Sequence, residues 1–301
     1  MKIVSYKNEK AHNKNKIAFK QMCEDMGFEY LECNDISHIP SNTDLIWSSM
    51  TTISPDSVPS QTKILFGPQF FTFPDPTHSI FYFDYRGKAV FTCLSGWIKT
   101  MFSEFIQGPR IDFTPCPFPI DIKKFCPDET PNKNNDILLY FKHRNLELKN
   151  KAIIIFEYLG LSYKLFEYGE YKEDAYIEAL QTSKLAVWIG CCESQGFALQ
   201  ECLSMNVPIL ILDAESMFDE CDQKTGIMYY EKEVGKYNLR GTSAYWWDER
   251  CGIKTTNIDD LAELISQMLN SLDSYKPREY VLENLSSTVC WNRLKGALSL
   301  N

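Results

Sequence analysis

Two glutamates enclose a short turn in the second half of the chain. Glu193 and Glu201 are separated by seven residues, an E-x7-E spacing. An apolar run over 185–189 precedes them, and a second apolar run over 207–212 follows. This order predicts a strand, a tight turn, a helix and a strand, with Glu193 in the turn and Glu201 on the helix. In open α/β sheets, ligands bind at this edge, outside the carboxyl ends of the strands.

The turn between the two glutamates has the features of an anion or hydroxyl site. It contains Ser194, and the backbone N–H groups of Gln195, Gly196 and Phe197 open the predicted helix. Unpaired N–H groups at a helix start attract negative charge, and a glycine lets a ligand approach the backbone closely. Two simpler interpretations stay open. Glu193 could serve as a helix cap, and Glu201 could be an exposed helix carboxylate.

A group of cations follows another predicted strand. Lys142, Arg144 and Lys149 come just after a predicted strand over 136–141. Arginine can bind two phosphate oxygens at once, so the group could hold a diphosphate. The alternative is a solvated basic turn, which the position of Arg144 directly after a strand disfavours.

The elements around these residues alternate between strand and helix. In the first half, we expect strands at 2–6, 28–32, 44–48, 63–66, 88–94 and 111–114, with helices over 16–26 and from Ser95, which could cap its helix. In the second half, we expect strands at 136–141, 163–168, 185–189 and 207–212, with helices over 146–159, 172–182 and 258–272 and one or two more in 278–298. Residues 213–257 show no regular pattern. Such alternation predicts α/β domains with parallel, doubly wound sheets.

A proline-rich and polar segment divides the two halves. It predicts a first Rossmann-like domain over 1–116, a linker over 117–135 and a second Rossmann-like domain over 136–275. Two such domains would form a small-molecule site between them.

Charge and composition narrow the possible functions. The net charge is −9, of which −8 lies in residues 136–301, so a general nucleic-acid binder is not expected. The 11 cysteines show no metal-ligand spacing and predict buried thiols in a reducing compartment. No apolar run is long enough to span a bilayer and no signal peptide is evident, so we expect a cytoplasmic protein without an integral membrane segment.

Four segments in order resemble the GT-B glycosyltransferases, above all their large retaining fourth sequence family, including its viral and microbial members. They are the Ser-x-Trp helix start at 95–99, the interdomain segment at 118–127, the strand ending in basic residues at 136–144, and the E-x7-E element at 193–201. The resemblance covers roughly residues 88–290. It implies two Rossmann-like domains, with final helices over 276–301 that cross back to the first domain.

The resemblance also implies an activity, namely transfer of a hexosyl or pentosyl group from a nucleotide sugar to a hydroxyl acceptor such as a glycan. The anomeric configuration would be retained, without metal or cofactor. In the family pattern, Arg144 and Lys149 or Lys151 hold the diphosphate, and Glu193 faces the donor sugar. Glu201 binds the ribose hydroxyls. Lys142 and the turn residues 194–197 would complete the donor site.

The acceptor side departs from the family pattern. The loop after the first strand, 7–13, has no glycine, and Gln69 stands where many members have a histidine. Gln69 or the nearby His78 would then face the acceptor. Two other functions therefore stay open: a GT-B-shaped nucleotide-sugar epimerase, and a non-catalytic nucleotide-sugar-binding module.

Overall fold

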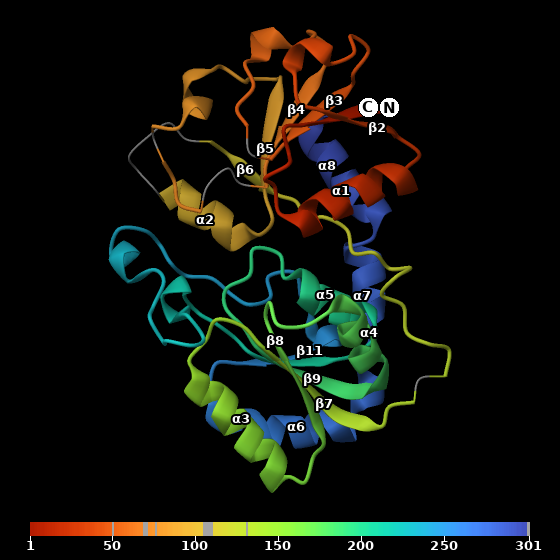
Figure 1. The fold of residues 1–301 in the computed structure, drawn as a ribbon, viewed down its shortest axis with the longest axis vertical. Coiled ribbons are helices and arrows are strands. Elements are labelled where there is room, and N and C mark those ends of the chain that lie inside the picture. Colours follow the sequence, from red (N-terminus) through yellow and green to blue (C-terminus); the bar gives the residue numbers. More distant parts are fainter. Residues whose placement is uncertain (50, 69–71, 76, 105–110, 131, 300–301) are drawn as a thin grey trace. The chain divides into compact units, whose positions relative to one another are not determined.

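In the computed structural model, the chain forms two compact units, each built around one parallel sheet (Figure 1). The structure describes residues 1–49, 51–68, 72–75, 77–104, 111–130 and 132–299. The first unit comprises Met1–Pro119 together with Leu285–Asn301, and the second comprises Ile120–Asn284. Both are α/β, as the sequence predicts.

The first unit has six parallel strands in the order β2-β1-β3-β4-β5-β6. Their bounds are β1 Lys2–Tyr6, β2 Glu29–Cys33, β3 Leu45–Ser48, β4 Lys63–Phe66, β5 Ala89–Cys93 and β6 Phe113–Pro115. The α-helices of this unit are α1 Asn13–Asp25, α2 Gly96–Glu104 and α8 Ser287–Leu298. The strand order reverses direction between β1 and β3, because the chain adds β2 on one side of β1 and all later strands on the other.

Asn8 lies just after β1, in the segment over 7–13 that contains no glycine. Its side-chain amide donates to Ser5 Oγ and Trp47 O at 3.0 and 3.1 Å, and its carbonyl oxygen accepts from Ser49 N at 2.8 Å. Buried polar groups require such partners, and Asn8 has them on both β1 and the β3 end. Asn8 therefore has a structural role at this switch point.

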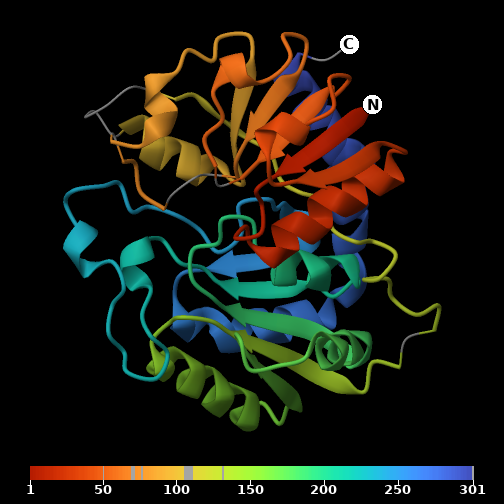
Figure 2. The same cartoon turned by 45° about the horizontal axis from the view of Figure 1, so that its top comes forward.

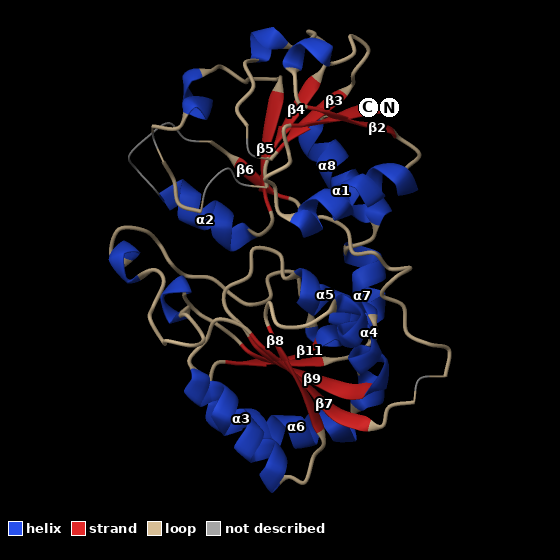
Figure 3. Ribbon diagram, viewed as in Figure 1, coloured by secondary structure: helices blue, strands red, loops and turns tan. Residues whose placement is uncertain are grey.

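The second unit has five parallel strands in the order β11-β10-β9-β7-β8. Their bounds are β7 Asn135–Phe141, β8 Tyr163–Glu167, β9 Ser183–Ile189, β10 Ile209–Leu212 and β11 Gly252–Thr255. The α-helices are α3 Leu146–Tyr158, α4 Glu173–Thr182, α5 Phe197–Ser204, α6 Leu261–Asn270 and α7 Pro277–Asn284. Figure 3 shows α3 and α6 on one face of this sheet, with α4 and α5 on the other.

The alternation of buried side chains explains this layering. Ile137, Leu139 and Phe141 of β7 pack with side chains of α3 and α6, such as Phe156 and Ile265. On the opposite face, Tyr140 stacks on Trp188 of β9 with ring centroids 3.8 Å apart. Both faces of each central strand are therefore buried, as is typical of parallel sheets.

The final helices are divided between the two units. α7 packs against α5 of the second unit, and α8 packs against α1 of the first (Figure 2). Beside α8, the ring centroids of Trp291 and Phe28 lie 4.8 Å apart. The fold class therefore matches the expectation. Of the two final helices, α8 belongs to the first unit.

Two local expectations differ from the structure. Ser95 Oγ is buried without a hydrogen-bond partner among the described residues, so the predicted cap of α2 is wrong. The strand β11 was not predicted, because its sequence Gly-Ile-Lys-Thr has too little apolar character for a strand pattern. Its Gly252 is required, since a side chain there would meet the Ile209 carbonyl oxygen at 2.1 Å from Cβ.

Within the described residues, no helix has both the length and the apolar character needed to cross a membrane. The 11 cysteines are free thiols, and only Cys126 is exposed.

Arg278 at the start of α7 joins three segments of the second unit. Its guanidinium donates to Phe125 O and Ser204 O at 2.9 and 2.6 Å, and to Ile122 O at 3.1 Å. The carbonyls of Ile122 and Phe125 belong to the predicted linker segment, and that of Ser204 belongs to the end of α5. One side chain therefore satisfies several backbone acceptors at the same place.

We expect Arg278→Ala to lower the free energy of unfolding by about 2–3 kcal/mol, because charge-assisted hydrogen bonds are lost and acceptors are left unpaired. Chemical denaturation followed by circular dichroism measures this change. Arg240→Ala, which removes an exposed arginine of the same unit, is the matched control. Equal effects of the two substitutions would contradict the assigned role of Arg278.

Candidate donor site at the switch point of the second sheet

The site lies where the strand order of the second sheet reverses, between β7 and β9. Their last residues, Phe141 and Ile189, are paired neighbours, and Lys142 N donates to Ile189 O at 2.9 Å. Ligands of open α/β sheets bind outside the carboxyl ends of the strands at such a point. The predicted cations follow β7, and Glu193 follows β9, so the topology brings both groups to one edge.

Lys142 and Glu193 form the centre of the site. Lys142 Nζ lies 2.7 Å from Glu193 Oε1, and both side chains are largely buried. Lys142 Nζ also lies 4.4 Å from the centroid of the Tyr168 ring. Burial would lower the pKa of Lys142, but the Glu193 carboxylate outweighs burial and raises that pKa. Lys142 therefore keeps its positive charge beside the Glu193 carboxylate, although its side chain is largely buried.

Arg144 is buried beside this pair and fixes the turn that carries Glu193. Its Nη1 donates to the Gly190 carbonyl at 3.0 Å, and the same carbonyl accepts from Ser243 Oγ at 3.2 Å. Arg144 is 8% exposed, so its charge acts through a medium of low polarity. A solvated basic turn is thereby excluded for Arg144.

The turn after β9 has the geometry expected from its glycine. Gly196 precedes α5 with a φ of 81°, and a Cβ there would lie 3.4 Å from Glu193 Cβ. Phe197 is the first residue of α5, and Ser194 lies in the turn. Glu193 N donates to Thr242 O at 3.0 Å, so the backbone of Glu193 is held by the segment 213–257. The N-cap residue of α5 is Gly196.

The side chains of Gln195 and Glu201 are both buried. The Gln195 side chain is buried and donates to Gln200 Oε1 at 2.9 Å, which stabilises the start of α5. Glu201 is 4% exposed, so the interpretation as an exposed helix carboxylate is wrong. Its backbone carbonyl accepts from Met205 N.

Lys149 lies in the first turn of α3, and its contacts there are with Glu167 and Phe141 rather than with Glu193. Its Nζ is 2.6 Å from Glu167 Oε1 at the end of β8 and 5.1 Å from the centroid of the Phe141 ring. Lys151, the alternative, pairs with Asp259 at 3.3 Å and is exposed. The structure thus connects Lys149, but not Lys151, to the end of β7.

The proposed acceptor residues lie in the first unit. The side chain of His78 accepts from Ile80 N at 3.3 Å and caps the short helix Ser79–Tyr82. Burial lowers the pKa of His78. Gln69 lies outside the described residues.

The segment 213–257 supplies the candidate site residues that sequence reasoning missed. It contains three short helical turns and β11, and Figure 3 draws the rest of it as loop. Asp213 follows β10 and accepts from Thr242 Oγ1 at 2.7 Å and from Ser243 N at 2.6 Å. Its position after a predicted strand was the available signal. These bonds hold the segment against the Glu193 turn.

Glu220 is the second missed residue, and no sequence motif marks it. It is 7% exposed, and the Cys192 N–H donates to its Oε1 at 3.2 Å. Burial raises the pKa of Glu220 to about 8, and repulsion from Glu193 adds to this effect against the opposing charges of Lys142 and Arg144. A second carboxylate therefore lies beside the cations.

A small hairpin over 220–229 holds Glu220 in place. Cys221 N donates to His143 O at 3.1 Å, and Tyr229 N donates to Glu220 O at 3.0 Å. The Tyr229 hydroxyl lies 3.4 Å from His143 Nδ1. Because His143 lies between Lys142 and Arg144, the hairpin is anchored to the segment that carries both cations.

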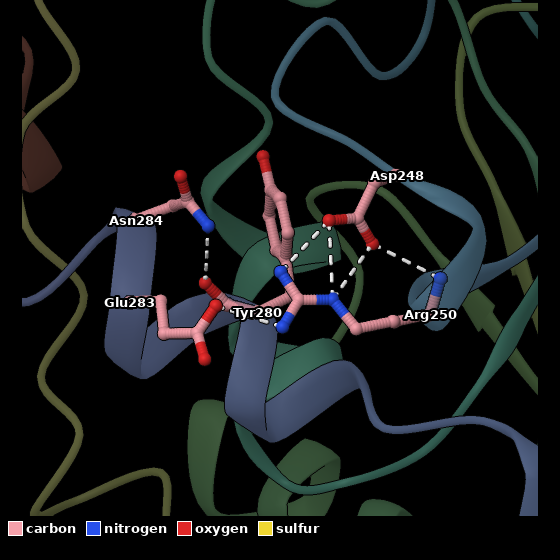
Figure 4. A network of polar contacts seen from close by, with 5 residues as sticks. All are labelled: Asp248, Arg250, Tyr280, Glu283 and Asn284. Atoms are coloured by element: carbon pink, nitrogen blue, oxygen red, sulfur yellow. Dashed lines mark hydrogen bonds and ion pairs between the residues drawn. The ribbon is translucent and has the colours of Figure 1, made fainter.

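The far end of the 213–257 segment is tied to α7 by a polar network (Figure 4). Arg250 donates to Asp248 Oδ2 at 2.9 Å and to Glu283 Oε2 at 2.7 Å, and it lies over the Tyr280 ring. Arg250 O also accepts from Lys276 N at 2.9 Å. The long segment is therefore fixed at both of its ends.

Among the described residues, no group of three or more His, Cys, Asp or Glu side chains is arranged to bind a metal ion.

One of three comparisons with known proteins finds this architecture. No protein-family model and no curated protein sequence matches the chain. Solved structures do. A glycosyltransferase from Rickettsia africae ESF-5 matches with a TM-score of 0.57 and 12% identity, over 100% of this chain and 99% of that one.

Two further structures match over the full length. Sucrose-phosphate synthase from Thermosynechococcus elongatus has a TM-score of 0.58 and 9% identity, over 100% of this chain and 99% of its own. The lipopolysaccharide outer core galactosyltransferase WaaB has a TM-score of 0.55 and 10% identity, over 99% of both chains. These neighbours are GT-B glycosyltransferases, and at such identities the likeness shows the fold: the chain has the GT-B fold.

Gly196 provides a test of the turn geometry. We expect Gly196→Ala to lower the free energy of unfolding by about 1 kcal/mol, because an L-residue is strained at this φ. We also expect weaker nucleotide binding, since the new Cβ contacts Glu193. Gly160→Ala is the matched control. Its φ is 68°, with open space around it.

Denaturation and nucleotide titration of both variants separate the two effects. Similar losses of stability are expected, with reduced binding in Gly196→Ala alone. Equal binding by the two variants would show that the turn does not form part of the site.

Proposed function

We propose that the chain is a glycosyltransferase that moves a sugar from a nucleotide-sugar donor to a hydroxyl acceptor. The observation that carries this proposal is the group of Lys142, Arg144 and Glu193 at the switch point of the second sheet, in a chain with the GT-B fold. A diphosphate needs cations and N–H donors, and a sugar needs a nearby acceptor for its hydroxyls. This site offers all three.

The ion pair suggests how the donor would be received. In the free protein, Lys142 compensates Glu193 at 2.7 Å. A diphosphate would compete for Lys142 and release Glu193 toward the sugar hydroxyls and the positive charge that develops at the anomeric carbon. Arg144 would stabilise the departing diphosphate. Catalysis would then rest on positioning and electrostatic stabilisation.

We further propose that transfer retains the anomeric configuration and needs no metal. Retention would follow front-face substitution, in which the leaving phosphate takes the acceptor proton, so no protein nucleophile is required. Lys142 and Arg144 would neutralise the charge that a metal ion neutralises in other transferases. Proton NMR of the product tests the first statement, and activity in the presence of EDTA tests the second.

A screen of nucleotide sugars tests the main proposal. Thermal stabilisation and slow nucleotide release would be measured with wild type, Glu193→Ala and Arg144→Ala. One donor that stabilises the wild type, with release lost in both variants, is the expected result. Conversion of a donor to its epimer without acceptor would favour an epimerase, and binding without release would favour a binding module.

A further inference from the structure

We infer that Glu220 acts as the proton-accepting group of the donor site, so that at alkaline pH the arrival of a nucleoside diphosphate is accompanied by uptake of up to one proton from water on Glu220. This inference rests on the proposed function. Glu220 belongs to no sequence motif and lies at the start of the hairpin over 220–229.

The charges of the site provide the first argument. Lys142 and Arg144 contribute two positive charges beside the two carboxylates of Glu193 and Glu220. With both carboxylates ionised, the group has no net charge. A diphosphate adds at least two negative charges, and in a largely buried site such an excess is costly. Protonation of one carboxylate is the smallest change that reduces it.

Local contacts decide which carboxylate takes the proton. The Glu193 carboxylate already pairs with Lys142 Nζ at 2.7 Å, so a proton placed on Glu193 would cost an ion pair. Within the described part of the chain, the only hydrogen bond to the Glu220 carboxylate comes from Cys192 N–H at 3.2 Å, and no cation lies within ion-pair distance of it. Glu220 is therefore the carboxylate that loses least when it becomes neutral.

The ends of two neighbouring strands place charged and titratable groups around Glu220. After β7 come Lys142 and Arg144, which favour its ionised form. After β9 come Glu193, which opposes ionisation, and the buried thiols of Cys191 and Cys192, whose own pKa values are raised by burial. These thiols stay neutral and do not compete for the role.

On its own hairpin side, Tyr230 faces Glu220. Burial raises the pKa of Tyr230 to about 12, so its hydroxyl stays neutral near pH 8. Because the pKa of Glu220 lies near 8 in the free protein, Glu220 is the group of this cluster that changes charge in the range where binding can be measured.

The sign of the pH dependence follows from linkage. If the bound diphosphate raises the pKa of Glu220 further, affinity is constant below the pKa of the free protein and falls above it. The limiting slope is about tenfold per pH unit. Below about pH 7, Glu220 is already protonated and no uptake from this group is expected.

Calorimetric titration with UDP, GDP and ADP tests the inference. Each is measured from pH 6.5 to 9.5 in two buffers of different ionisation enthalpy, which gives the number of protons taken up. For the nucleotide that binds, we expect about half a proton or more at pH 8.5 in the wild type. The terminal phosphate of the nucleotide, with a pKa of about 6, exchanges protons in the same way with every variant, so its contribution cancels when variants are compared.

Glu220→Gln is the decisive variant, because its amide still accepts from Cys192 N–H but stays neutral. We expect no proton uptake at pH 8.5, an affinity that does not fall above pH 8, and an affinity at pH 9 about tenfold above that of the wild type. Glu231→Gln removes an exposed carboxylate of the same segment and is the matched control, expected to behave as wild type.

The outcomes separate the two proposals. Binding with the same proton count and pH dependence in Glu220→Gln as in the wild type would overturn the inference alone. Absence of binding by every nucleotide would overturn the proposed function and this inference with it. If Glu220→Gln does not fold, the wild type decides: an infrared difference spectrum with and without nucleotide must show a carboxylic acid formed at pH 8.5, and its absence refutes the inference.

Discussion

Replacing Glu193 by glutamine is expected to slow sugar transfer by about 10²–10³-fold, with a smaller effect on donor binding. The substitution keeps the size of the side chain but removes the negative charge that faces Lys142. If Glu193 stabilises charge that develops only in the transition state, its loss lowers kcat more than it raises KM.

The measurement is the rate of nucleotide release from the donor found in the screen, at saturating and at low donor concentration. Glu147→Gln removes an exposed carboxylate at the start of α3 and serves as the control. A kcat within twofold of wild type for Glu193→Gln would remove Glu193 from the catalytic group.

Replacing Arg144 is expected to have an effect of similar or greater size. Arg144→Ala should reduce kcat/KM by about 10³-fold, since it removes a buried cation beside the proposed diphosphate site. It also removes the bond to Gly190 O, so the turn after β9 loses one of its two side-chain donors to that carbonyl.

The conservative variant Arg144→Lys separates these two contributions. Lysine keeps the charge but cannot donate to Gly190 O and to a phosphate as a planar fork. We expect Arg144→Lys to recover part of the donor affinity and little of the rate. Circular dichroism and the melting temperature of both variants report on folding. Full activity of Arg144→Lys would mean that charge alone is required.

Much of the fold could be predicted because its central strands are buried on both faces. The runs over 137–141 and 185–189 are apolar without interruption, which is what a covered parallel strand requires. β11 was not predicted from the sequence, because Gly252–Thr255 lies at an edge of the sheet, where only part of the strand is buried.

The grouping of the candidate site residues could be predicted where they follow strands. Lys142, Arg144 and Glu193 each come just after an apolar run, and parallel strands bring their carboxyl ends to one edge. Glu220 could not be found in this way, because a single glutamate in an irregular segment gives no indication of burial. Its position depends on the hairpin bonded to His143 O, a contact between residues 78 positions apart.

His78 has a local structural role that its place in the sequence did not indicate. A histidine in a loop offers acid–base chemistry to any interpretation of the sequence, whereas here its ring accepts from Ile80 N and caps a short helix. Local side-chain bonds to the backbone compete with functional roles for such residues.

The division of the final helices determines the order in which the chain can complete its parts. The second unit is continuous from Ile120 to Asn284, but the first needs Leu285–Asn301 to supply α8. During synthesis, the N-terminal half therefore remains incomplete until the second unit has left the ribosome, the reverse of the usual order for successive domains. Residues 1–119 made alone would leave the side chains of α1 and Phe28 without α8 and Trp291, whereas 120–284 contains every strand and helix of its own sheet.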